Sequence, residues 1–242
     1  MKKIVVLTAF LGMVLTISAQ DNLRFGFQAS PSFSWMSTDN SHINPSGTNL
    51  GLKLGMIGEY YLNAEQTYAF STGLGFAFNS GGTLLHDYGG EYWTKAGLPS
   101  DLDTLSNSVK LKYSIQYLEI PVALKMRTKE FGYVRYFIEP GISIGFKTQA
   151  RGVINDPGKT GENEEKYSIR KEINGLNLTW GVGAGLEYSL SENTSLVGGL
   201  GFQIGFSDVT DNNGTVFDPR GNHKEDSKGV TRAIVIRLGV MF

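Results

Sequence analysis

The sequence of 242 residues contains no cysteine. This absence excludes a disulfide framework, a thiolate zinc site, a cysteine nucleophile and an acylated lipoprotein amino terminus. An excess of one charge is also missing, because 22 Lys and Arg residues stand against 23 Asp and Glu residues. A nucleic-acid-binding protein normally carries a basic footprint, so we expect no nucleic-acid partner.

Long hydrophobic runs are missing after the first twenty residues. Two lysines precede the apolar run Ile4–Ile17, and the small residues Ser18 and Ala19 follow it before the polar Gln20. The run is shorter than the roughly 20 residues that a membrane-spanning helix needs, which disfavours an anchor. It is typical of a secretory signal peptide, 1–19, cleaved after Ala19. We expect residues 20–242 to form one exported domain.

Glycine and aromatic residues are abundant, and most of the remaining chain alternates between apolar and small or polar residues. The 31 glycines are nearly twice the usual share of ~7%. Alternation with a period of two predicts β-strands. The expected strands are 23–35, 49–62, 67–79, 109–126, 133–147, 173–190, 195–207 and 230–242. The alternation changes phase in the fourth strand, which predicts a bulge near Tyr117.

The two faces of these strands differ in composition, and the difference indicates whether water or lipid surrounds the domain. One face is large and apolar, whereas the other is rich in glycine and serine with a few charges. Glycine on a water-facing strand weakens it without gain, but it suits the crowded interior of an eight-stranded barrel. Hydrocarbon then fits the apolar outer face. The pattern predicts an all-β, eight-stranded antiparallel up-and-down transmembrane barrel, and the alternative is a secreted β-sandwich or lipocalin-like barrel.

The connections between the expected strands alternate in length. Those after strands two, four and six are short, and those after strands one, three, five and seven are long and polar. Outer-membrane barrels have short periplasmic turns and longer extracellular loops. Aromatic residues fall near both ends of the strands, as interfacial girdles do: Tyr60, Tyr68, Tyr136, Tyr188 and Phe242 at the turns, and Trp35, Phe78, Phe146 and Phe206 at the loops. The predicted location is the Gram-negative outer membrane, with its lipid and the barrel assembly machinery as partners.

Nine charged residues are expected on the inner face. They are Arg24, Lys53, Glu59, Glu119, Lys125, Arg135, Glu139, Glu187 and Arg237. Buried charges persist when they are paired and hydrogen-bonded, so four carboxylates and five cations predict an ion-pair network that fills the lumen. Two alternatives are a narrow polar path through the barrel and a catalytic carboxylate pair, Glu119 and Glu139.

The expected loops carry no recognisable catalytic, cofactor or metal site. The three histidines are far apart in sequence, and the oxygen-rich run Asp208–Asp226 lacks the spacing of an EF-hand. The second long loop is unusually aromatic, with Tyr88, Tyr92 and Trp93. These side chains are expected either to fold over the barrel mouth or to form a contact surface for a protein partner.

The segment Gln116–Val122 contains the sequence YLEIP, and Phe137–Gly141 follows on the next expected strand. In these segments the chain resembles the PorT-like outer-membrane β-barrel family of Bacteroidetes, although Glu-Pro-Gly stands where the family usually has a GxG element. The resemblance implies a barrel of unassigned role for most members and a part in protein export for the PorT branch.

We therefore predict a non-enzymatic outer-membrane barrel with a structural or interaction role through its extracellular loops. The alternatives are a small-solute pore and a membrane-embedded hydrolase or acyltransferase.

Overall fold

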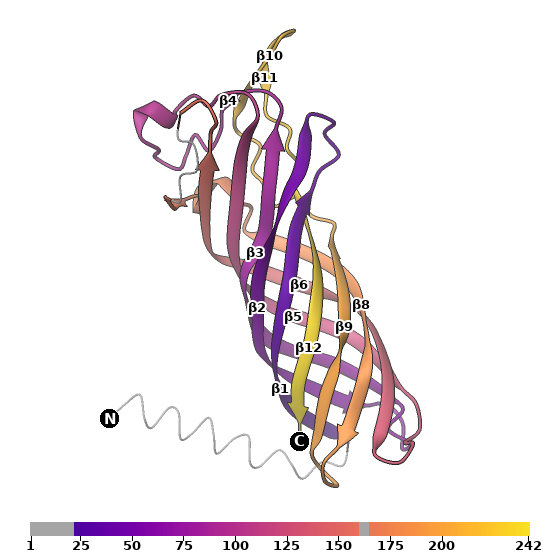
Figure 1. The fold of residues 1–242 in the computed structure, drawn as a ribbon. Helices are drawn as coiled ribbons and strands as arrows, with labels where there is room; N and C mark the ends of the chain where they lie inside the picture. The colour runs from indigo at the N-terminus through magenta and orange to yellow at the C-terminus, as the bar shows by residue number, and fades with distance from the viewer. Residues whose placement is uncertain (1–21, 160–164) are drawn as a thin grey trace, which may run out of the picture.

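The computed structural model describes residues 22–159 and 165–242, in which eight long strands close into a ring (Figure 1). The strands are β1 (Leu23–Ser37), β2 (Ile43–Tyr61), β3 (Tyr68–His86), β5 (Val109–Arg127), β6 (Val134–Asn155), β8 (Leu176–Ser189), β9 (Ser195–Gly205) and β12 (Val230–Met241). Each pairs antiparallel with its neighbours along the chain, and β12 pairs with β1 to complete the ring. The predicted eight-stranded up-and-down barrel is confirmed.

The described residues contain no helix that is long and apolar enough to span a membrane. The predicted signal peptide, 1–19, and its cleavage after Ala19 lie outside the described residues.

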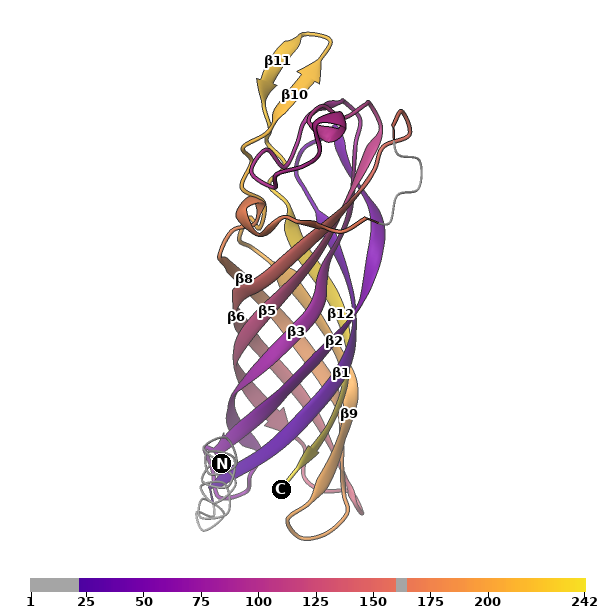
Figure 2. The ribbon, with the colours of Figure 1, turned by 90° about the vertical axis from the view of Figure 1, so that its left-hand side faces the viewer.

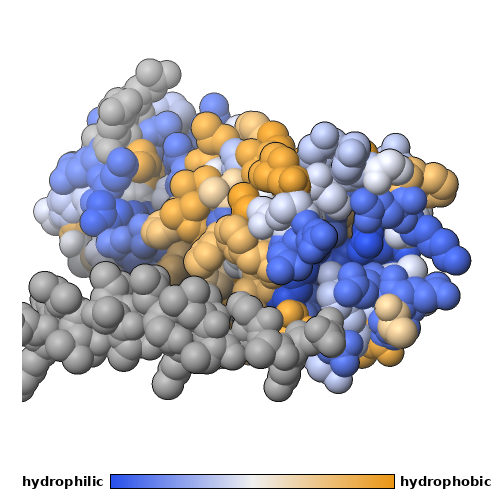
Figure 3. Space-filling model, turned by 90° about the horizontal axis from the view of Figure 1, so that it is seen from below, coloured by the Kyte–Doolittle hydropathy of each residue, from blue (hydrophilic) through white to orange (hydrophobic). Residues whose placement is uncertain are grey.

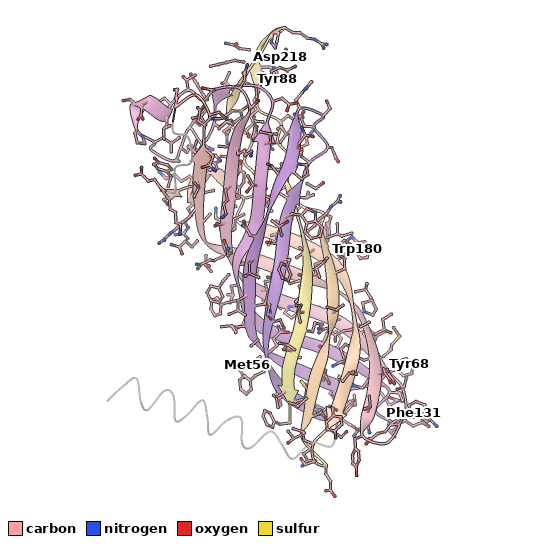
Figure 4. All side chains as sticks on the ribbon, in the orientation of Figure 1. Met56, Tyr68, Tyr88, Phe131, Trp180 and Asp218 are labelled. Atoms are coloured by element: carbon pink, nitrogen blue, oxygen red, sulfur yellow. The ribbon has the colours of Figure 1, made fainter. Side chains whose placement is uncertain are left out.

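Large apolar side chains point outward along the barrel, and small or polar ones point inward. On β1, for example, Phe27 and Phe33 are exposed while Ser30 and Ser32 are buried. Tyr68 and Trp180 likewise project from the outer wall (Figure 4). Seen from below, hydrophobic side chains gather over the middle of the molecule, with hydrophilic ones to either side (Figure 3). A water-soluble barrel would have the opposite arrangement. We call these outward-facing apolar residues the apolar belt. It extends from the tyrosines at the turn ends of the strands up to the level of Leu50, Leu118, Phe146 and Leu176.

Three strands extend at least six residues further at their loop ends than the alternation predicted. β2 starts at Ile43, β3 continues to His86, and β6 continues to Asn155. With the first part of β5 they form a four-stranded sheet that rises beyond the loop ends of the other strands (Figure 2). We call residues 43–48, 80–86, 109–116 and 149–155 the extracellular sheet. Part of each predicted loop, 36–48, 80–108 and 148–172, is therefore strand. The alternation did not reveal these segments because here large apolar residues such as Leu84 and Leu111 face inward, the reverse of the membrane-spanning part.

The predicted irregularity near Tyr117 is present, because the pairing of β5 with β6 shifts register between Gln116 and Tyr117. The extra residues lie on the two neighbouring strands, at Thr148 on β6 and between Ala77 and Ser80 on β3. β5 itself therefore keeps its odd-numbered residues inward, from the buried Val109 to the buried Arg127. The apparent change of phase in β5 marks the level at which its inner face changes from polar to apolar.

The extracellular sheet is covered on its inner side by loop segments that build a separate apolar core. Short elements in these loops are β4 (Gly90–Glu91), η2 (Ser100–Leu102), β7 (Tyr167–Ser168) and η3 (Arg170–Glu172). The hairpin of β10 (Thr215–Asp218) and β11 (Gly221–Lys224) pairs with β4 and projects beyond them (Figures 1 and 2). The extracellular core comprises Met36, Ile43, Ala77, Leu84, Tyr92, Trp93, Leu102, Leu105, Val109, Leu111, Tyr113, Ile115, Tyr117, Ala150, Ile154, Ile169, Ile173, Val209 and Val216.

Candidate functional site

The turn end of the lumen contains a dense group of ion pairs. Glu187 of β8 lies 2.6 Å from Lys125 Nζ, 3.0 Å from Arg127 Nε and 3.2 Å from Arg24 Nη1. Glu59 of β2 binds Lys125 Nζ at 2.6 Å and also accepts a hydrogen bond from Arg127. Because all five side chains are largely removed from solvent, removing one partner would leave a buried charge uncompensated.

Two further pairs lie between this group and the mouth of the barrel. Arg237 Nη2 donates to Glu139 at 3.0 Å, and the guanidinium packs against Gly183, where an added Cβ would require it to move. Lys53 Nζ lies 2.8 Å from both Glu119 Oε2 and Gln203 Oε1. Successive ion pairs therefore occupy the lumen, and we call all nine charged residues the lumen network: Arg24, Lys53, Glu59, Glu119, Lys125, Arg127, Glu139, Glu187 and Arg237.

The lumen network contains eight of the nine charged residues that the sequence predicted, but not Arg135. That residue instead pairs with Glu130 of the adjacent turn at 3.0 Å and is partly exposed. Arg127 takes its place, with a buried guanidinium that contacts two carboxylates. The sequence prediction assigned Arg127 to a turn, although it continues the odd-numbered inward face of Lys125. Extending the strand by one residue would have identified it.

The structure does not bring Glu119 and Glu139 together as a carboxylate pair, because each has its own cation partner. A cavity of about 100 Å³ lies between their ion pairs, lined by residues such as Gln28, Ser143 and Thr179. The Ser143 hydroxyl and Glu139 Oε2 are buried there without a hydrogen-bond partner. Polar atoms in such a space are suited to binding ordered water.

Among residues 22–159 and 165–242, no three His, Asp or Glu side chains are grouped so that they could hold a metal ion. In the oxygen-rich loop, the Asp208 carboxylate accepts hydrogen bonds from Thr210 and Asn212, at 2.6 to 2.9 Å. These bonds shape the turn itself.

The aromatic residues of the second long loop fold over the barrel mouth. Tyr92 and Trp93 are almost completely buried in the extracellular core. The Trp93 indole meets the Tyr113 ring edge-on, with centroids 5.3 Å apart, and its N–H donates to the Tyr113 hydroxyl. Only Tyr88 reaches the surface, where it lies near the top of the molecule (Figure 4). The prediction of a contact surface made of Tyr88, Tyr92 and Trp93 is therefore wrong, because Tyr92 and Trp93 are buried.

Burial shifts the pKa values of several side chains in the extracellular part, and His86 and Glu172 are two of them. His86 packs against the Tyr92 ring, and burial lowers its pKa to about 3. Glu172 of η3 accepts a hydrogen bond from the Lys95 backbone, and burial together with nearby Asp211 raises its pKa to about 7. Lys95 Nζ also binds Asp211 at 2.6 Å, so these residues join three loops.

These two shifts have opposite effects on stability as the pH falls. A lowered histidine pKa contributes stability above pH 6.5 that is lost during acidification, whereas the raised Glu172 pKa contributes stability at low pH that is lost as the pH rises through about 7. Glu225 also has a pKa raised by burial, so the histidine effect is isolated as a difference between two variants. Between pH 6.5 and 5 we expect Glu172→Gln to lose roughly 2 kcal/mol more loop stability than Glu172→Gln/His86→Phe. Hydrogen exchange of residues 92–108, corrected for intrinsic rates, measures both losses, and an equal pH dependence in the two variants would contradict the assignment.

Comparison with known proteins places the chain among membrane barrels. A family model described as "Outer membrane protein beta-barrel domain" matches residues 18–211. No relative is found among curated proteins. Similar solved structures include Neisserial surface protein A, with 12% identity, coverage of 90% of this chain and 95% of that one, and a TM-score of 0.46. A major outer membrane protein from Thermus thermophilus has 19% identity, 91% and 98% coverage, and a TM-score of 0.44. The outer membrane protease OmpT from Escherichia coli has 9% identity, 93% and 97% coverage, and a TM-score of 0.32.

Proposed function

Because the chain belongs to the outer membrane protein beta-barrel family, which resides in the Gram-negative outer membrane, we propose that it is a non-enzymatic barrel with a closed lumen and an extracellular interaction surface. The observation that carries this proposal is the filling of the barrel by two different barriers in series. The lumen network occupies the turn end and the middle, and the extracellular core lies over the mouth.

The two barriers oppose passage for different physical reasons. In the network each carboxylate is bound by a cation, so a hydrated ion would have to displace several ion pairs to pass. In the extracellular core a solute would have to cross packed aliphatic and aromatic side chains, including Leu111 and Tyr113, which exclude water.

We expect the purified full-length protein to show no steady conductance steps in planar bilayers. A porin reconstituted in the same way provides the positive control, and a heat-dependent gel shift confirms that the inserted protein is folded. Steady nanosiemens-scale steps would support the small-solute pore and would contradict a closed lumen.

An enzymatic role receives no support from the arrangement of side chains. The residues around the lumen cavity include Ser143, Glu119 and Glu139, but no histidine lies among them. His86 is buried in the extracellular core, and His42 and His223 are in separate loops. A hydrolase or acyltransferase would need a nucleophile and a base within hydrogen-bond reach of each other.

We propose that the working surface is the polar exterior of the extracellular part. Its most prominent element is the β10–β11 hairpin, whose outer strand, Gly221–Lys224, is exposed throughout. Asp218 marks its projecting end (Figure 4). The resemblance to PorT-like proteins suggests a partner in protein secretion. Crosslinking in intact cells followed by purification tests this suggestion, with a hairpin-deleted variant as the control. Mass spectrometry of the purified protein also tests cleavage after Ala19.

A further inference from the structure

The outer side of the extracellular sheet differs from both the apolar belt and the lumen. The sheet continues the barrel wall upward on one side of the molecule only (Figures 1 and 2). Its inner side is closed by the extracellular core, whereas on its outer side Asn44, Ser46, Thr48, Lys110 and Lys112 are exposed. This face is therefore accessible and mainly polar, with the partly buried Leu85 and Val153 paired with the two lysines.

Positive charge predominates among the described residues of this face. Lys110 and Lys112 project outward from β5, between the buried residues Val109, Leu111 and Tyr113. Arg151 is exposed on the neighbouring strand, β6, diagonally next to Lys112, whose direct partner is Val153.

Carboxylates are scarce on this face among the described residues, and the one in contact with it is Asp87, just past β3, whose Oδ1 lies 3.5 Å from Asn44 Nδ2. The four strand segments of the extracellular sheet contain no Asp or Glu. Within the described parts of the chain, neither Lys110 nor Lys112 lies within 4.0 Å of a carboxylate. The remaining exposed strand residues are mainly hydroxyls and amides, such as Asn44 and Ser46, which can hydrogen-bond to sugars and phosphates.

The height of the two lysines identifies the layer that they face. On β5 the outward apolar residues end at Leu118, and Lys112 and Lys110 lie six and eight residues further up the strand. At about 3.3 Å per residue and a tilt of roughly 45°, they stand roughly 15–20 Å above the edge of the apolar belt. A phospholipid headgroup layer is only about 5–8 Å thick, so an anion at this height belongs to a taller headgroup.

We propose that the outer face of the extracellular sheet binds the phosphorylated saccharide headgroup of an outer-leaflet glycolipid, with Lys110 and Lys112 contacting its phosphates. The height excludes an ordinary phospholipid, the excess of positive charge around Lys110 and Lys112 selects an anion, and the hydroxyl and amide side chains suit a sugar. The site faces outward from the barrel wall, where lipid surrounds the molecule, so a membrane component reaches it directly.

The test measures binding of detergent-purified full-length protein to a lipopolysaccharide that carries its phosphorylated core sugars. We expect Lys110→Gln/Lys112→Gln to weaken binding roughly 30-fold, because each lysine near an anionic lipid surface contributes about a fivefold factor. The matched control is Lys224→Gln/Lys228→Gln, which removes two positive charges from the extracellular hairpin region and should leave binding unchanged. A heat-dependent gel shift confirms that every variant is folded.

Further ligands distinguish the source of the anion. The same glycolipid without phosphates, phosphatidylglycerol and inorganic phosphate should each bind much more weakly to the wild type. Equal losses in the two double variants, unchanged binding by Lys110→Gln/Lys112→Gln, or equally tight binding of phosphatidylglycerol would overturn the proposal. Preferential binding of a soluble sulfated polysaccharide would also overturn it and point to a partner outside the membrane. Conductance does not bear on this site, so a conducting barrel would leave the lipid proposal intact.

Discussion

Replacing Glu187 with alanine is expected to lower the free energy of unfolding by about 3–5 kcal/mol, the typical result of removing one partner from a buried ion pair. Glu187 contacts Arg24, Lys125 and Arg127, and these cations would share only the remaining carboxylates. The midpoint temperature of the heat-dependent gel shift measures the loss. Glu119→Ala should have a smaller effect, because Glu119 has one cationic partner, Lys53, which also binds Gln203.

The matched control for this prediction is Glu192→Ala, at an exposed carboxylate in the turn that follows β8. Exposed ion pairs contribute at most about 1 kcal/mol, so this variant should behave like the wild type. If Glu187→Ala and Glu192→Ala shifted the midpoint equally, the lumen network would not stabilise the barrel.

Replacing Trp93 with alanine should unfold much of the extracellular part while leaving the barrel closed. The side chain is almost completely buried against Tyr113 and lies directly over Gly152 of β6, and truncation of a buried tryptophan typically costs about 3–5 kcal/mol. We expect faster proteolysis of the loop segment 92–108, with a gel-shift midpoint close to that of the wild type. The extracellular core and the lumen network would then be separate units of stability.

The same substitution at a tryptophan on the outer wall controls for the loss of an indole. Trp180 of β8 is about half exposed in the apolar belt. Trp180→Ala should not change proteolysis of the loops. Loss of the heat-dependent shift in Trp93→Ala would show that the barrel depends on its cover, contrary to this expectation.

The membrane-spanning part could be predicted from the sequence because one rule applies to every strand there. Hydrocarbon outside and a crowded lumen inside force apolar residues such as Phe27 outward and small or charged ones such as Ser30 inward. The same rule failed above the membrane. In the extracellular sheet, water is outside and a packed core is inside, so Leu84 and Leu111 face inward and Lys112 faces outward.

The lumen network shows a similar limit at the ends of strands. Alternation placed eight charged residues correctly, but it could not say where a strand stops, and so it assigned Arg127 to a turn and Arg135 to the network. Tyr92 and Trp93 are buried by contacts with β5 and β6, which are distant in sequence. The residues next to Tyr92 and Trp93 in the sequence therefore could not decide between burial and a contact surface.

The pairing of β1 with β12 has a consequence for how the molecule is assembled. These strands come from opposite ends of the described chain, and backbone hydrogen bonds between Phe25 and Phe242 extend their seam to the last residue. Until β12 pairs with it, β1 keeps an unpaired edge, which is a template for pairing with other chains. Contacts so remote in sequence also form slowly. Closure of the β1–β12 seam therefore removes the exposed strand edges of the barrel, and with them a site at which unfolded chains aggregate.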